Sequence, residues 1–162
     1  MARPLAAGPT FREVTKRRSD GGPSLAELVE LGKGLAHPAR LRILAMLDGG
    51  ELCVCQMTAV LDLAASTVSQ HLAVLERGGL VTDRKEGKLV FYRLRSGRAA
   101  EEVLEPLLAH LAGDPEVRTD RAVVRRLRRV PIARLCAAEL DLVAIGVRRP
   151  APLLAPVHSR RG

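Results

Sequence analysis

The spacing of the apolar residues changes once along this chain, and that change predicts the fold. Between residues 25 and 75, leucine and valine recur every three or four residues, which is the period of amphipathic helices. After Gly78-Gly79 the spacing becomes that of two short strands, Leu80–Thr82 and Leu89–Leu94, joined by a charged turn with Gly87 at its tip. With two Phe, one Tyr and no Trp, the core must be aliphatic. We therefore expect a mainly α-helical fold with a small β-hairpin.

Capping residues predict where the individual helices begin. Ser24 is a good N-cap because Glu27 follows three residues later, and Pro38 suits the first turn of a second helix. A short third helix is expected at Val54–Leu61, and Ser66 can cap a fourth after a tight turn. The full set of expected helices is 24–36, 38–48, 54–61, 66–77 and 97–112, with one or two more after residue 115.

The net charge of +8 lies at the two ends of the chain. Residues 1–23 hold five Lys and Arg against two acids, residues 24–112 ten against eleven, and residues 113–162 eleven against five, which gives +3, −1 and +6. We expect a disordered basic leader, one folded domain, and a basic C-terminal extension that is partly helical and then flexible. Such ends suit a polyanion, either nucleic acid or an anionic surface, or they are solvated tails.

The composition argues against a membrane protein, a disulfide scaffold and an enzyme. No apolar run reaches the length of a membrane span, and the N-terminus lacks the apolar centre of a signal peptide. We therefore expect a cytoplasmic protein whose three cysteines are free thiols or ligands. Phosphate-binding glycine loops, HExxH motifs and paired catalytic carboxylates are absent from the sequence, so no catalytic activity is expected.

The third and fourth helices and the hairpin that follows them predict a winged helix-turn-helix. The fourth helix begins with short polar side chains, and no acidic residue stands between Ser66 and Leu75. Such groups can contact phosphates or base edges, although an amphipathic helix with a polar face towards solvent would show the same sequence pattern. We predict DNA contacts from Ser66, Thr67, Ser69, Gln70 and His71 on this helix, and from Arg84, Lys85 and Lys88 on the hairpin.

Four segments together resemble the arsenic-repressor (ArsR/SmtB) family of bacterial winged-helix regulators. They are LAHPARLRILAML, ELCVCQ, LAASTVSQHLAVLERGGLV and RKEGKLVFYRL, and the resemblance covers about residues 25–112. It implies a homodimer built on the first and last helices of that core. It also implies repression of a resistance operon through operator DNA, and release from DNA when a metal or metalloid binds.

Two cysteines with one residue between them are candidate ligands for a soft ion. Thiolates prefer soft ions, and trivalent arsenic or antimony suits sulfur ligands. Residues i and i+2 point apart in an ideal helix, so Cys53 and Cys55 can share an ion only where the helix has not begun or is unwound. In the arsenic-sensing members a third Cys follows three residues later, and here that residue is Thr58. Cys136 is then the candidate third ligand, with arsenite or antimonite as inducer.

Two other interpretations of the cysteines stay open. Cys is often a small buried hydrophobe, and Cys136 has Leu135 and Leu140 as neighbours in sequence. Alternatively, Cys53 and Cys136 can form a disulfide or polysulfide link in a winged-helix repressor that senses oxidants or reactive sulfur. The C-x-C pair favours the metalloid, because a redox sensor of that kind needs only one of the two cysteines.

Overall fold

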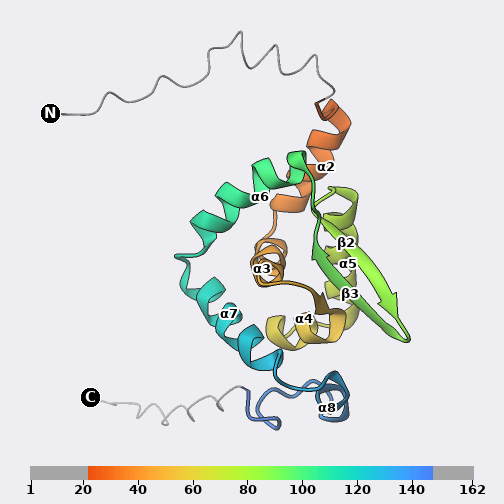
Figure 1. Cartoon of the computed structure of the whole chain (residues 1–162), viewed down its shortest axis with the longest axis vertical. Helices are drawn as coiled ribbons and strands as arrows, with labels where there is room; N and C mark the ends of the chain where they lie inside the picture. The colour runs from red at the N-terminus through yellow and green to blue at the C-terminus, as the bar shows by residue number, and fades with distance from the viewer. Residues whose placement is uncertain (1–21, 148–162) are drawn as a thin grey trace, which may run out of the picture.

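The computed structural model of the chain describes residues 22–147 (Figure 1). The predicted leader at 1–23 and the predicted flexible end beyond residue 147 lie almost entirely outside these residues. The elements are α2 (Leu25–Leu35), α3 (Pro38–Leu47), β1 (Leu52–Cys53), α4 (Val54–Leu61), α5 (Ala65–Arg77), β2 (Val81–Glu86), β3 (Leu89–Leu94), α6 (Arg98–Leu111), α7 (Pro115–Leu127) and α8 (Ile132–Ala137). The fold is mainly helical with a small β-hairpin, as predicted, and a short third strand extends the hairpin to a three-stranded sheet.

Local sequence signals account for several helix boundaries. Ser24 caps α2 in a capping box, in which its Oγ accepts from the Glu27 N–H and the Glu27 carboxylate accepts from the Ser24 N–H at 2.7 Å. Pro38 opens α3, where its missing N–H costs nothing. Helix α4 spans the predicted residues and ends at Asp62, whose φ of 55° stops the helical path.

The start of α5 differs from the prediction. The helix begins at Ala65, with Ala64 in the cap position and no side-chain hydrogen bond to the first turn. Ser66 was expected to cap the helix, but it lies inside the first turn, beyond the position from which a hydroxyl can cap. The first N–H groups of α5 therefore have no side-chain cap.

The sheet has the strand order β1-β3-β2, and all pairs are antiparallel. Strands β2 and β3 form the predicted hairpin, but β2 runs on to Glu86, because its exposed, charged half also pairs in register with β3. Gly87 turns the chain at the tip with φ of +60°. Strand β1 was not predicted: Leu52 and Cys53 add a short third strand by pairing with Tyr92 and Phe91.

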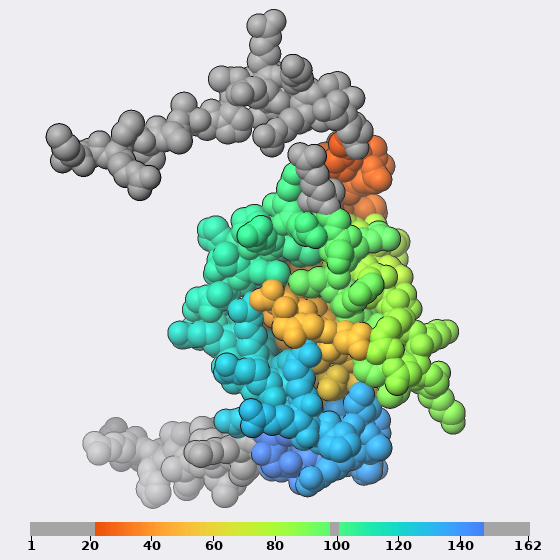
Figure 2. All heavy atoms as spheres, in the orientation of Figure 1, coloured from red at the N-terminus to blue at the C-terminus, as the bar shows by residue number. Residues whose placement is uncertain are grey.

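Helix α3 lies at the centre of the fold, and the other elements surround it (Figure 1). Its side chains Ile43, Leu44 and Leu47 are buried among residues from α4, α5 and the sheet. The same core includes Val117, Val124 and Leu127 of α7 and Leu135 of α8. Residues of α7 and α8 lie directly against the domain in Figure 2, so the described part of the extension shares one core with it.

No single helix within residues 22–147 is long and apolar enough to cross a membrane. Only α4 and α5 taken together reach the length and hydropathy of a span, and they are bent by 113° at their junction. That bend is within the usual range for the two helices of a helix-turn-helix.

Candidate nucleic-acid interface and cysteine site

The polar start of α5 is presented to solvent. Ser66, Ser69 and Gln70 are exposed and Thr67 is half-buried, whereas Val68 faces the core. The uncapped N–H groups of the first turn and the positive end of the helix dipole point the same way. This end of α5 is therefore suited to a phosphate, with the exposed Ser and Gln side chains beside it.

His71 has a different environment from the other predicted DNA contacts. Its ring centroid lies 4.5 Å from that of His37, and its Nδ1 lies 3.4 Å from Arg40 Nη1. Burial, with smaller effects from the charges of His37 and Arg40, lowers the pKa of His71 below 6.5. These contacts give the half-buried ring a packing role between α5 and the start of α3, and its contact with DNA stays a prediction.

The three predicted cations of the hairpin also differ from one another. Lys85 and Lys88 are exposed near the tip, which projects from the body of the molecule in Figure 2, and neither forms an ion pair within residues 22–147. Arg84 is held by carboxylates. Its guanidinium donates to Glu51 at 2.9 Å and to Glu86 at 2.6 Å, and it lies 4.6 Å above the Phe91 ring.

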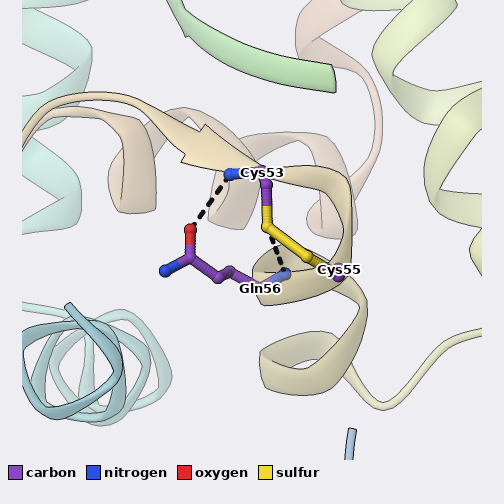
Figure 3. The surroundings of a disulfide bond; sticks show 3 residues. All are labelled: Cys53, Cys55 and Gln56. Atoms are coloured by element: carbon purple, nitrogen blue, oxygen red, sulfur yellow. Dashed lines mark hydrogen bonds between the residues drawn. A yellow bond between two sulfur atoms is a disulfide. The ribbon is translucent and has the colours of Figure 1, made fainter. Parts of the chain in front are cut away.

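Cys53 and Cys55 meet at the start of α4 (Figure 3). Cys53 is the N-cap in extended conformation and Cys55 lies in the first turn, so the helix has not begun at the first cysteine. Their Cα atoms are 5.4 Å apart, and a disulfide joins the two sulfurs. The sequence predicted free thiols; that was wrong for this pair, because the extended backbone at Cys53 turns its side chain back towards Cys55.

Gln56 holds this junction from inside the protein, and sequence analysis missed it. Its Oε1 accepts from the Cys53 N–H at 3.0 Å, and its own N–H donates to Cys53 Sγ at 3.4 Å. The two bonds form a capping box in which sulfur takes the place of the usual hydroxyl (Figure 3). The Gln three residues after Cys53 was the available signal. A backbone N–H pointing at Sγ favours a negatively charged sulfur when the pair is reduced.

The predicted third ligand is not part of this junction. Cys136 is a free, exposed thiol on α8. Among the described residues, no group of three His, Cys, Asp or Glu side chains is arranged to hold a metal ion. Thr58, one turn after Cys55, is buried, and its hydroxyl has no hydrogen-bond partner among residues 22–147. The structure therefore brings two of the three candidate cysteines together.

Comparison with known proteins shows which family the chain resembles. The family model described as "Bacterial regulatory protein, arsR family" matches residues 37–83. The biofilm growth-associated repressor of Agrobacterium fabrum is 45% identical over 83 residues, which are 51% of this chain and 70% of that protein. The chain belongs to the arsR family. The arsenical resistance operon repressor of Escherichia coli is 48% identical over 67 residues, or 41% of this chain and 57% of that protein.

A solved structure agrees with this assignment. The transcriptional repressor BigR from Xylella fastidiosa superimposes with a TM-score of 0.50 at 30% identity, covering 65% of this chain and 97% of that one. This arsR-family chain is thus a winged helix-turn-helix regulator and not an enzyme. The matched segment includes Cys53, Cys55 and all of α5. Arg84, most of the hairpin, and Cys136 lie beyond it.

Proposed function

We propose that this arsR-family regulator is a homodimeric, cytoplasmic repressor that binds double-stranded operator DNA and leaves it when trivalent arsenic or antimony binds Cys53 and Cys55. The observation that carries the proposal is the position of the two sulfurs at the start of α4, one on the N-cap residue and one in the first turn. They lie together on the helix that leads directly into α5. A ligand that reshapes this junction acts directly on the helix-turn-helix formed by α4 and α5.

The DNA-binding part of the proposal rests on α5 and the hairpin tip. The uncapped, exposed N-terminus of α5 accepts a phosphate and places Ser69 and Gln70 towards base edges. Lys85 and Lys88 provide phosphate contacts in the neighbouring groove. Both groups act through charge and hydrogen bonding, so affinity falls steeply with salt.

The dimer part rests on the apolar surface of α2. Leu25, Leu28 and Val29 are 79%, 45% and 48% exposed, although α2 is a helix with a strong apolar stripe. A groove of about 550 Å³ runs beside them between α2, the end of α5 and the start of α6. A second copy that packs on this surface removes the exposed leucines from water and fixes the spacing of two α5 helices.

The chemistry of induction is ligand exchange on reduced thiols. Each S–H that binds arsenite gives its proton to an As–OH group, which leaves as water, so two cysteines replace two hydroxyls and release two waters. The third position stays with hydroxide, a small thiol, or Cys136 of either subunit. Soft sulfur donors favour trivalent arsenic and antimony over hard cations.

The disulfide favours a second candidate, a repressor that senses oxidants through the same pair. Two thiols give two protons and two electrons to a peroxide, which leaves as two waters, and Cys53 and Cys55 become the disulfide seen in the structure. This differs from the redox interpretation drawn from the sequence, which paired Cys53 with Cys136. Both candidates use the same element and differ only in what reacts with it.

Fluorescence anisotropy on DNA from the chain's own upstream region separates the two candidates. The protein is kept reduced with a phosphine and titrated with arsenite, and in a parallel series it is titrated with peroxide after the phosphine is removed. The proposal expects arsenite to release the wild type from DNA and to leave Cys53→Ser and Cys55→Ser bound. Cys136→Ser should also be released, with a weaker response if Cys136 supplies the third ligand. Release by peroxide but not by arsenite would agree with a redox-sensing repressor and would overturn the proposal that a metalloid is the inducer. No binding to the DNA in any state would overturn both.

A further inference from the structure

Three residues on three different strands form a single row across the sheet. Phe91 of β3 pairs with Cys53 of β1 on one side and with Arg84 of β2 on the other. Directly opposed residues on antiparallel strands place their side chains on the same face. The Arg84 guanidinium lies over the Phe91 ring accordingly, at 4.6 Å. The cysteine junction and the hairpin arm are thus neighbours through one residue.

A second link connects the same two strands around β3. Glu51 directly precedes β1, and both of its carboxylate oxygens accept from Arg84, through Nε and Nη2. The remaining terminal nitrogen, Nη1, donates to Glu86 of the same strand at 2.6 Å. Strands β1 and β2 do not pair with each other, so this two-bond fork is what ties them directly. Each of the three guanidinium nitrogens of Arg84 therefore donates to a carboxylate within the protein.

We propose that Arg84 is a positioning residue that couples the cysteine junction to the hairpin, and not a phosphate contact. The inference rests on the proposed function, and it describes how ligand binding at the cysteines affects the hairpin, which is the second proposed DNA-binding element after α5. The base of the hairpin packs on α5 and on the core through Val81, and its arm is linked to β1 and Glu51 through β3 and through this fork. A ligand on Cys53 that shifts β1 shifts Phe91 and Glu51 with it, and the hairpin arm turns relative to α5.

The lysines nearer the tip provide the contrast that makes the assignment testable. Lys85 is adjacent to Arg84 in sequence and exposed, and no ion pair within the described part of the chain engages it. A residue that binds phosphate releases a counterion, so its removal reduces the salt dependence of DNA affinity by about one in the log–log slope. A positioning residue leaves that slope unchanged.

The test compares four variants of the full chain on the upstream DNA by anisotropy over a range of salt concentrations, with and without arsenite. Lys85→Met is expected to lower the slope by about one and to keep the arsenite response. Arg84→Met and Arg84→Lys are expected to keep the wild-type slope and to reduce the arsenite-induced loss of affinity roughly tenfold, because neither side chain can grip Glu51 with a fork. Glu51→Gln leaves every cation in place and is expected to weaken the arsenite response in the same way.

The opposite assignment gives a different set of results. If Arg84 binds phosphate, Arg84→Met lowers the slope as Lys85→Met does, Arg84→Lys behaves as wild type, and Glu51→Gln strengthens binding by freeing the guanidinium. Any of these outcomes in folded protein, checked by thermal unfolding of each variant, overturns the inference. The slopes need no inducer, so they decide the role of Arg84 even if arsenite leaves wild type on the DNA and the proposed function fails.

Discussion

Asp120 of α7 is held by Arg42 of α3 through two parallel bonds, Nε to Oδ2 at 2.6 Å and Nη2 to Oδ1 at 2.9 Å. The Asp120 side chain is 4% exposed, and Arg42 also reaches the exposed Glu116 at 2.8 Å. The hydrogen bonds that Arg42 donates to Asp120 raise the pKa of Arg42, so the guanidinium stays charged. The pair joins residues 78 positions apart and fixes the start of the extension to the central helix.

Removing the charge of Asp120 is expected to destabilise the protein strongly. Asp120→Asn leaves the partly buried guanidinium with only the exposed carboxylate of Glu116, which costs about 2–4 kcal/mol of unfolding free energy. Glu116→Gln is the matched control, because its side chain is 63% exposed and its loss should cost less than about 0.5 kcal/mol. Urea unfolding of the three proteins measures both values. Equal small effects would mean that α7 is not held by this pair.

The extension shows why sequence alone reached only part of the fold. Helix α4 and strand β3 were predicted at their observed residues, since caps, turns and apolar period are local signals. The docking of α7 combines its buried valines and Leu127 with the Arg42–Asp120 pair, and no local pattern in the sequence predicts a pair so far apart. Strand β1 is only two residues long and exists because β3 lies beside it. Such elements are defined by tertiary contacts.

The close approach of α2 to the end of α5 gives a second prediction. A Cβ added at Gly78 would lie 2.9 Å from the backbone oxygen of Glu30 and 3.4 Å from Leu31 Cα. Backbone atoms cannot rotate away, so Gly78→Ala should cost about 1–3 kcal/mol. Gly113→Ala is the control, because nothing lies within 4 Å of its Cβ position. Thermal unfolding distinguishes them, and similar melting temperatures for the two variants would contradict the packing described.

The candidate site residues were chosen from the sequence by residue type, and the structure shows contacts of these residues that the sequence did not predict. The cysteine pair, the polar start of α5 and the hairpin cations were all identified from the sequence. Their partners were not: Gln56 at Cys53, Glu51 at Arg84, and His37 at His71. Each partner is a common polar residue whose role depends on the fold, so only the geometry separates the predicted DNA contacts that are exposed from those that are engaged within the protein.

Acidification is expected to weaken the fold through His71. Burial lowers its pKa in the native state, so the unfolded chain takes up a proton first as pH falls below about 6.5. Stability is therefore full above that pH and declines below it, until the native ring also protonates. Urea unfolding at pH 7.5 and 5.5 should show a smaller loss for His71→Gln than for wild type. The pKa values of Glu27 and Glu30 are lowered by Ser24 and Lys33, so protonation of these carboxylates reduces stability only below about pH 4.5.

An equal loss of stability in His71→Gln and wild type would refute this role. The same pair of proteins then tests the predicted DNA contact. If the ring only packs between α5 and α3, His71→Gln should leave the salt dependence of DNA binding unchanged, whereas a protonated ring on a phosphate would add to the slope at pH 5.5.

Thr58 offers a way to complete the sulfur site. It lies three residues after Cys55, and residues three apart share a helix face. Its buried hydroxyl has no hydrogen-bond partner in the described part of the chain, so Thr58→Val should be neutral or stabilise the protein by up to about 1 kcal/mol. Thr58→Cys should tighten arsenite binding at least about tenfold, because a third sulfur replaces a weaker donor in the same coordination sphere.

The ultraviolet absorption of arsenic–thiolate bonds, titrated under phosphine, measures that affinity in wild type, Thr58→Cys and Thr58→Val. The valine variant controls for the change in packing, and Cys136→Ser in each background reports whether α8 supplies a ligand. If the third sulfur comes from Cys136 in the wild type, that mutation should weaken binding there and have no effect in the Thr58→Cys background. Unchanged affinity in Thr58→Cys, together with no effect of Cys136→Ser on the wild type, would mean that arsenite does not bind at the start of α4.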